Sequence, residues 1–127
     1  MQLLQPGDPV PHFVVSTIEG GTLRYADLWQ RRNLVLVKLP AGGPHGDYVS
    51  GLTAVAAEFR AHDTACVMTT DRIPGLPSAG VVVADRWGEI VHVATAPRAA
   101  GLPAARELLE WVEFLEHRCP ECEGEAR

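Results

Sequence analysis

The sequence predicts an α/β fold, and three observations lead to this expectation. Apolar runs of strand length alternate with an amphipathic segment of helix length, a pattern typical of a strand, helix and strand unit with parallel strands. A later pair of apolar runs flanks a tight turn and predicts an antiparallel hairpin. The chain has 127 residues, 46% of them hydrophobic, which fits one domain with its own core.

The N-terminal part of the chain predicts a small hairpin followed by a buried strand. Residues 13–15 and 22–24 flank a Gly-Gly turn and are expected to pair, and residues 25–29 can form a short helical turn. The run 34–39 is apolar at nearly every position. A strand that is apolar on both faces belongs in the middle of a covered sheet.

A glycine- and proline-rich loop separates this strand from the first long helix. The loop covers residues 40–46, and Asp47 is expected to cap the helix that follows. Apolar residues then recur at spacings of four, three and four, which predicts one continuous helix with a single apolar face; they are Tyr48, Leu52, Val55 and Phe59.

The second half of the chain predicts three strands and a final helix. Residues 65–68 form the strand parallel to 34–39, and residues 81–84 and 90–93 form the hairpin, with Gly88 as its left-handed residue. The last helix is expected to run from about Pro103 to about residue 118. Its apolar face comprises Leu108, Val112 and Leu115, and Pro120 prevents its extension.

Composition argues against several classes of partner. The net charge is −5 and the basic residues form no run, so no nucleic-acid partner is expected. No apolar segment approaches the roughly 20 residues that span a bilayer, and the first residues lack the pattern of a secretory signal. We therefore expect a cytoplasmic protein without a membrane partner, in which a Cys-x-x-Cys pair serves metal binding or catalysis.

Several segments in this order resemble the peroxiredoxin and redoxin (AhpC/TSA-like) branch of the thioredoxin-like superfamily. They are Gly7-Asp8-Pro9-Val10-Pro11-His12-Phe13, the Gly-Gly turn, Tyr25-Ala26-Asp27-Leu28, the strand 34–39 with Pro40, and Val83-Ala84-Asp85-Arg86-Trp87-Gly88-Glu89-Ile90. The resemblance covers residues 4 to 117. It implies a three-layer thioredoxin-like fold, a central mixed sheet flanked by helices with an N-terminal hairpin extension, and an active site in the loop after strand 34–39.

The loop in which relatives carry their reactive cysteine has none in this sequence. At that position the chain reads Pro44-His45-Gly46-Asp47, without a threonine nearby, and residues 77–80 lack the arginine that the resemblance leads one to expect. Conventional peroxidase chemistry is therefore not expected at this degenerate active-site loop. His45 and Asp47 are interpreted either as a solvated residue and a helix cap, the favoured interpretation, or as a surviving polar site for an anion.

Two of the three cysteines stand near the end of the chain, in Cys119-Pro120-Glu121-Cys122. We expect a redoxin domain over residues 1–118 and an acidic tail over 119–127. The pair could be a redox dithiol, a zinc knuckle to which His117 adds a ligand, or part of a passive tail. Two knuckles meeting across a two-fold axis would give a Cys₄ site, which links zinc to a homodimer. Cys66, within a strand, is expected in the core.

Two functional hypotheses follow from these observations. The first is a redoxin-like thiol-disulfide oxidoreductase that uses Cys119 and Cys122 as its catalytic pair, toward a partner protein and not toward peroxide. The second is a non-catalytic thioredoxin-like binding or accessory module whose tail is a zinc knuckle, with a dimer interface as one location for the metal. No cofactor other than zinc is suggested by the sequence.

Overall fold

The computed structural model describes residues 2–77 and 79–117 of the chain. Its elements follow in the order β1 (Val14–Ser16), β2 (Thr22–Arg24), the 3₁₀ turn η1 (Tyr25–Asp27), β3 (Asn33–Lys38), α1 (Gly46–Ala54), α2 (Ala56–Ala61), β4 (Thr64–Thr69), β5 (Ala79–Ala84), β6 (Ile90–Ala96), the 3₁₀ turn η2 (Ala99–Gly101) and α3 (Ala105–His117). The predicted strands and helices are thus present, most with somewhat different ends.

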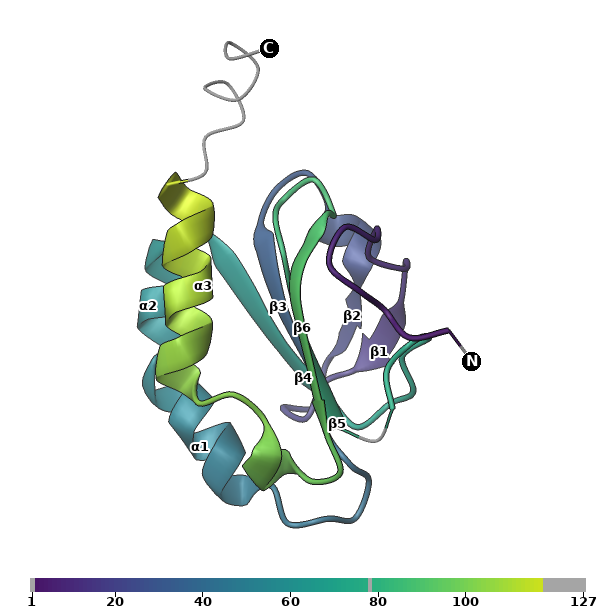
Figure 1. Ribbon diagram of the computed structural model, residues 1–127. Helices are drawn as coiled ribbons and strands as arrows, with labels where there is room; N and C mark the ends of the chain where they lie inside the picture. Colours follow the sequence, from purple (N-terminus) through teal and green to yellow (C-terminus); the bar gives the residue numbers. More distant parts are fainter. Residues whose placement is uncertain (1, 78, 118–127) are drawn as a thin grey trace, which may run out of the picture.

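The central sheet has four strands in the order β4-β3-β5-β6. β3 pairs with β4 in parallel and with β5 in antiparallel orientation, and β6 is antiparallel to β5. This is the predicted mixed sheet, in which a crossover through α1 and α2 joins the two parallel strands (Figure 1). Gly88 has a φ of +86°, the left-handed conformation predicted for the β5–β6 turn.

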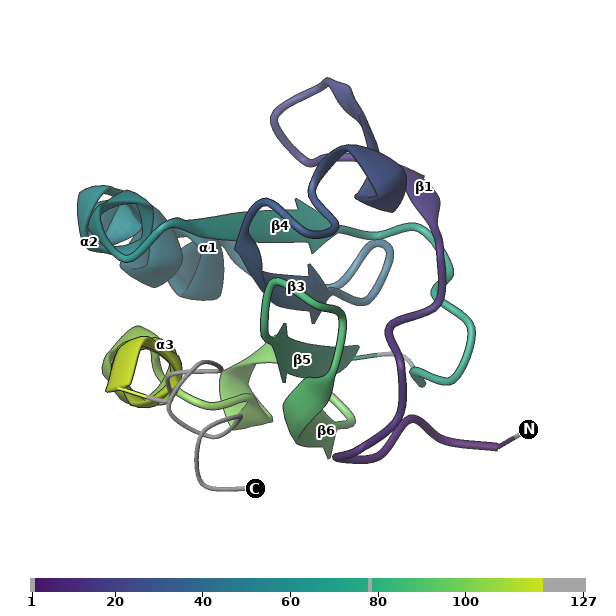
Figure 2. The same ribbon diagram turned by 90° about the horizontal axis from the view of Figure 1, so that it is seen from above.

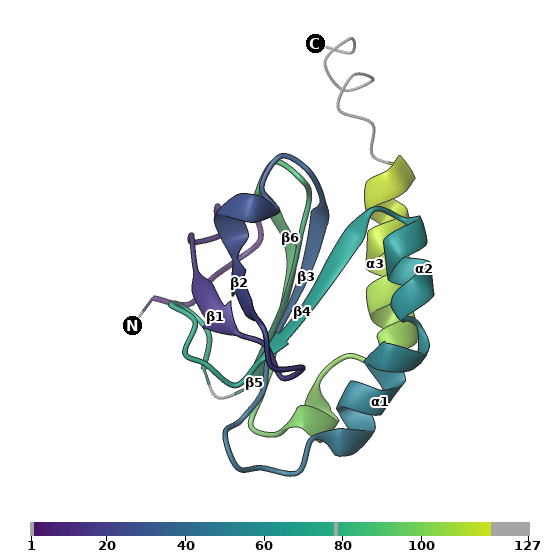
Figure 3. The same ribbon diagram turned by 180° about the vertical axis from the view of Figure 1, so that it is seen from behind.

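The molecule has three layers. The helices α1, α2 and α3 cover one face of the sheet (Figure 1, Figure 3), and the N-terminal segment with the β1–β2 hairpin and η1 covers the other (Figure 2). Every residue of β3 is buried, because the strand is covered on both faces. Val35 and Val37 pack in the cluster under the helices, while Leu34 and Leu36 pack in the cluster under the N-terminal layer.

The single helix predicted from the stripe of Tyr48, Leu52, Val55 and Phe59 is wrong in one respect, because the structure breaks it at Val55. This residue has φ −110° and ψ 15°, outside helical values, and separates α1 from α2. The preceding residues favour a break: Gly51 lowers helix propensity, and the Thr53 hydroxyl donates a hydrogen bond of 2.9 Å to the Val49 carbonyl oxygen, which bends helices.

The last helix agrees with its predicted apolar face. Leu108, Val112 and Leu115 are buried in the cluster under the helices, and Leu109 joins them. The helix begins at Ala105, so Pro103 precedes it and is not in its first turn. None of the helices in the described ranges is long and apolar enough to cross a membrane.

Candidate functional site

The loop between β3 and α1 lies at the carboxyl end of β3 (Figure 1). Crevices at the carboxyl ends of parallel strands are where open α/β sheets commonly bind ligands. Residues 40–47 contain no cysteine. The loop is largely exposed, with His45 half-buried and Asp47 exposed.

The predicted cap at Asp47 is wrong. α1 begins at Gly46 and its N-cap is His45, whose carbonyl oxygen accepts the first helical hydrogen bond from the Val49 N–H at 3.0 Å. The His45 side chain makes no capping hydrogen bond to the described part of the chain. Asp47 instead lies in the first turn, where its carboxylate meets the positive end of the helix dipole.

Tyr48 connects the start of α1 to the start of α3. Its hydroxyl donates a hydrogen bond of 2.7 Å to the Pro103 carbonyl oxygen. Burial raises the pKa of this phenol far above its usual range, and the nearby Cys66 and Glu107 add to the effect. The side chain is therefore a neutral donor that packs against the core, and α3 begins at the same end of the sheet as the loop.

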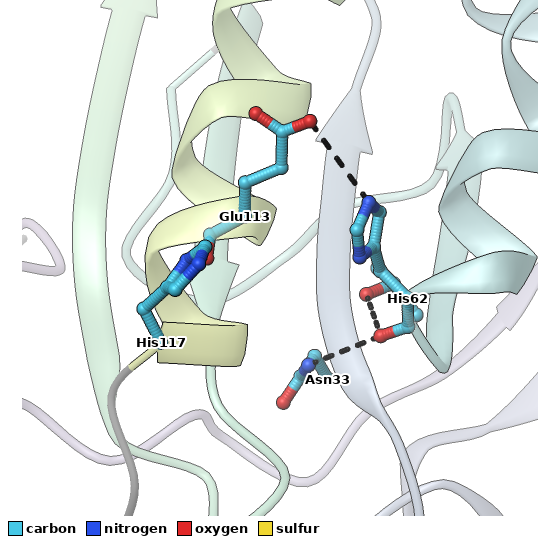
Figure 4. A network of polar contacts seen from close by, with 5 residues as sticks. Asn33, His62, Glu113 and His117 are labelled. Atoms are coloured by element: carbon cyan, nitrogen blue, oxygen red, sulfur yellow. Dashed lines mark hydrogen bonds and ion pairs between the residues drawn. The ribbon is translucent and has the colours of Figure 1, made fainter.

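The other end of α3 lies at the opposite end of the sheet (Figure 1). There Glu113 Oε2 lies 4.0 Å from His62 Nε2, and Asn33, the first residue of β3, donates its side-chain amide to the His62 carbonyl oxygen at 3.5 Å (Figure 4). The last helix therefore runs away from the β3–α1 loop. Cys119 and Cys122 follow this helix in sequence and lie outside the described residues.

His117, a predicted zinc ligand, is the last described residue of α3 and is exposed. Its Nδ1 lies 2.8 Å from the Glu113 carbonyl oxygen. Because a carbonyl oxygen can only accept, Nδ1 carries the proton, and in the neutral ring Nε2 holds the lone pair. Metal-ligating histidines commonly make such a bond through their other ring nitrogen. Within residues 2–77 and 79–117, no three His, Cys, Asp or Glu side chains form a group able to hold a metal ion.

Cys66 is the free cysteine within the described ranges. It lies on the edge strand β4, half-buried, and packs against the cluster under the helices as expected. Burial raises the pKa of its thiol to about 12, and the charge of Glu19 contributes in the same direction. A thiol that stays protonated at neutral pH is a poor nucleophile.

A polar cluster that the sequence analysis missed lies at the carboxyl ends of β3 and β4. Lys38 is only 8% exposed, and its Nζ donates a hydrogen bond of 2.9 Å to the Leu39 carbonyl oxygen. Asp71 is held in place nearby, since its Oδ2 accepts the Ser16 N–H at 2.7 Å. The Thr69 hydroxyl accepts the Asp71 N–H at 2.9 Å and donates to the Ser16 carbonyl oxygen at 2.7 Å.

Desolvation lowers the pKa of the Lys38 ammonium, while the negative charge of Asp71 opposes this shift. The sequence contained a signal for this residue. Of the 11 basic residues ten are arginines, and Lys38 is the chain's one lysine. Lysines are seldom buried without a partner, so a single lysine inside an apolar strand marks a position of interest.

A second missed contact joins the sheet to α3. The His92 and Trp111 rings stack with centroids 4.5 Å apart and an interplanar angle of 15°. His92 Nε2 is buried and has no hydrogen-bond partner among the described residues. Burial lowers the pKa of His92, and the charge of Glu107 opposes this shift.

This stack predicts a pH-dependent stability. Burial lowers the pKa of His92, so this side chain binds a proton less readily in the folded chain than in the unfolded chain. The stability that neutral His92 contributes is therefore fully present above the unfolded pKa of 6.5. It is lost as the pH falls from 6.5 toward the lower pKa of the folded chain. Between about pH 7.5 and about pH 5.5, the wild type should therefore lose more stability than H92F, which keeps a ring on Trp111. Thermal unfolding at both pH values checks this; an equal loss would contradict it.

Comparison with solved structures assigns the fold. The chain has the thioredoxin-like fold of the peroxiredoxins, a class that the mixed sheet and its flanking helices already indicate. The reduced 2-Cys peroxiredoxin of Plasmodium vivax matches with a TM-score of 0.72 at 11% identity, over 90% of this chain and 83% of that one. The AhpC of Mycobacterium tuberculosis matches with a TM-score of 0.69 at 13% identity, over 94% of this chain and 98% of the other.

A third neighbour comes from outside the peroxiredoxins. A protein described as a thiol:disulfide interchange protein DsbE, from Chlorobium tepidum, matches with a TM-score of 0.62 at 14% identity, over 89% of this chain and 98% of that one. No family model matches the sequence, and no curated protein does. At these identities the neighbours establish the redoxin-like fold, and the chemistry has to be argued from this chain's own residues.

Proposed function

We propose that this chain is a redoxin-fold thiol-disulfide oxidoreductase that acts through Cys119 and Cys122 and not through the loop after β3. The observation that carries the proposal is that neither the loop after β3 nor Cys66 offers a reactive thiol. Residues 40–47 contain no cysteine, and burial raises the pKa of the Cys66 thiol to about 12. Thiol chemistry on this fold is thus left to the terminal pair.

The position of the pair after α3 indicates what kind of substrate it would serve. The C-terminal end of a helix carries a partial negative charge, and Glu113 and Glu116 are both exposed in the last turns of α3. Both effects disfavour the thiolate form of a cysteine that follows the helix, with Arg118 in the sequence opposing them, and so slow its attack on peroxide. A dithiol of this kind suits exchange with a disulfide of a docked partner protein, where proximity compensates for low intrinsic reactivity.

Redox titration of the purified full chain tests the proposal. We expect a reversible two-electron dithiol and disulfide couple that C119S and C122S each abolish, while the matched variant C66S leaves it unchanged. Peroxide consumption should be negligible in all four proteins. A wild-type chain that no dithiol reductant or protein disulfide can reduce or oxidise would contradict the proposal, as would a couple that survives in C119S.

A second candidate function is a non-catalytic binding module whose tail holds zinc. The favouring observation is the bond from His117 Nδ1 to the Glu113 carbonyl oxygen at 2.8 Å, because it leaves Nε2 as the ligating nitrogen. His117, Cys119 and Cys122 would then supply three ligands from one chain. Alternatively, the cysteines of two chains would form a Cys₄ site at a homodimer interface, and zinc would deprotonate the thiols outright.

Metal analysis of protein purified without chelator separates the two candidates. A shared Cys₄ site predicts about half an equivalent of zinc per chain and a dimer that C119S dissociates. A site completed by His117 predicts about one equivalent, reduced in H117Q. Metal-free protein whose oligomeric state is unchanged after deletion of residues 119–127 would contradict the zinc function.

A further inference from the structure

Exposed aromatic side chains gather at the end of the sheet where β3 begins. Trp29, which follows η1, is 40% exposed, and Trp87, in the β5–β6 turn, is 53% exposed. The Trp29 Nε1–H donates a hydrogen bond of 3.1 Å to the Trp87 carbonyl oxygen. Phe114 is exposed in the last turns of α3, which finish at the same end of the sheet (Figure 1). These three are among the five large hydrophobic side chains exposed in the described ranges, and such clustering is typical of an interface.

A series of polar contacts connects the segments at this end into one surface. The Gln30 N–H donates to the Arg86 carbonyl oxygen at 2.6 Å, and Gln30 is held at a left-handed φ of +70°. The Arg86 guanidinium lies 3.5 Å from the Asp63 carboxylate. The neighbouring His62 pairs with Glu113 of α3 (Figure 4). A surface that is fixed in this way loses little conformational freedom when a partner binds.

The charges on this surface are divided into two halves from opposite layers of the molecule (Figure 2). The basic half comes from the segment after η1 and the β5–β6 turn, and comprises Trp29, Arg31, Arg32 and Trp87. The acidic half comes from the last two turns of α3, and comprises Glu110, Phe114 and Glu116. All seven side chains are exposed, and the four charged ones form no ion pair within residues 2–77 and 79–117. Each half therefore offers aromatic surface and free charge that the other half would complement.

We propose that a second copy of this chain docks on this surface, with the basic half of each copy against the acidic half of the other. An isologous interface about a two-fold axis requires such a pair of complementary halves on one surface, because every contact from i to j is matched by one from j to i. Tryptophan and arginine, which make up the basic half, are the residues most enriched at interface hot spots. The interface needs neither thiol chemistry nor metal, so it stands independently of the functions proposed above.

Sedimentation equilibrium of the full chain tests the association, with reductant and chelator present to exclude disulfide-linked and metal-linked dimers. We expect a reversible monomer–dimer equilibrium. R31E/R32E should raise the dissociation constant about tenfold or more, because like charges then meet in the interface. R98E/R106E provides the matched control: it changes the net charge equally, but Arg98 follows β6 and Arg106 lies in the first turn of α3, both exposed at the other end of the sheet. This control should shift the dissociation constant far less.

Reversal of the acidic half separates local complementarity from general repulsion. E110R/E116R brings the net charge from −5 to −1 and so reduces the repulsion between copies, yet it should also weaken the dimer. Combining E110R/E116R with R31E/R32E places opposite signs on facing halves again and should restore most of the wild-type affinity. Circular dichroism checks that each variant is folded. A folded combined variant that is no tighter than either parent variant would contradict the proposed pairing of the halves.

The aromatic part of the interface is tested by W87A. This variant should weaken the dimer, whereas L3A should not, because it shortens an exposed side chain near Gly75, at the other end of the sheet. A wild-type chain that stays monomeric at about 0.5 mM would overturn the proposal and leave this surface to a different partner. A dimer that forms only without reductant and chelator would assign the contact to the terminal cysteines and overturn it equally.

Discussion

Replacing Phe59 by alanine should lower the free energy of unfolding by about 3–5 kcal/mol. Phe59 is 1% exposed and packs in the cluster between the helices and the sheet. Its ring is the large buried side chain of the short helix α2, which spans only six residues and cannot be stable without tertiary packing. Urea unfolding followed by circular dichroism measures the change.

Phe114 gives a matched control for this substitution. It is 49% exposed on α3 and contacts only the edge of Trp111 among the aromatic rings of the described chain, with centroids 5.8 Å apart. F114A should therefore cost less than about 1 kcal/mol. Equal losses in F59A and F114A would show that α2 contributes little to the core.

Replacing Gly75 by alanine should lower the free energy of unfolding by about 2–5 kcal/mol. Gly75 has a φ of +85°, and a Cβ there would lie 2.7 Å from Leu4 Cγ and 3.2 Å from the Leu4 backbone nitrogen. The left-handed backbone costs about 1–2 kcal/mol and the crowding about 1–3 kcal/mol more. The same two residues also hold the N-terminal segment in place, because the Leu4 N–H donates a hydrogen bond of 3.0 Å to the Gly75 carbonyl oxygen.

Gly42 isolates the backbone part of this cost. Its φ is +76°, and an added Cβ would meet nothing within 4 Å. G42A should therefore lose only the left-handed penalty of about 1–2 kcal/mol. Thermal unfolding of both variants gives the comparison, and a G42A loss as large as that of G75A would contradict the assigned clash with Leu4.

The strands were predictable because their signal is local. β3 and β5 are buried at every position, and the interior positions of both strands are apolar, as is typical of strands covered on both faces. The hairpin turn was equally predictable, because Gly88 adopts the positive φ that its position demands. The spacing of Leu108, Val112 and Leu115 likewise located the buried face of α3.

The break at Val55 was less accessible. A helical stripe of apolar residues continues through Val55, and the local features that favour a break, Gly51 and the Thr53 hydroxyl, do not by themselves end a helix. The same holds for Asp47, where a one-residue change in the start of α1 moves the carboxylate from the cap into the first turn. End positions of helices depend on such small differences in tertiary contact.

The charge that acts on Lys38 and the ring that stacks on His92 come from residues far apart in the sequence. Asp71 reaches the end of β3 only because β4 runs parallel to it, and Trp111 meets His92 only because α3 crosses the face that β6 presents. No spacing pattern in the sequence connects Asp71 with Lys38 or Trp111 with His92. The absence of cysteine from residues 40–47, by contrast, could be read directly from the sequence.

The direction of α3 connects two opposite ends of the molecule. The helix has 13 residues, and at 1.5 Å per residue it spans about 20 Å from the end of the sheet that carries the β3–α1 loop to the end that carries His117. A label attached to the loop and a label attached at His117 would therefore report on opposite ends of the sheet.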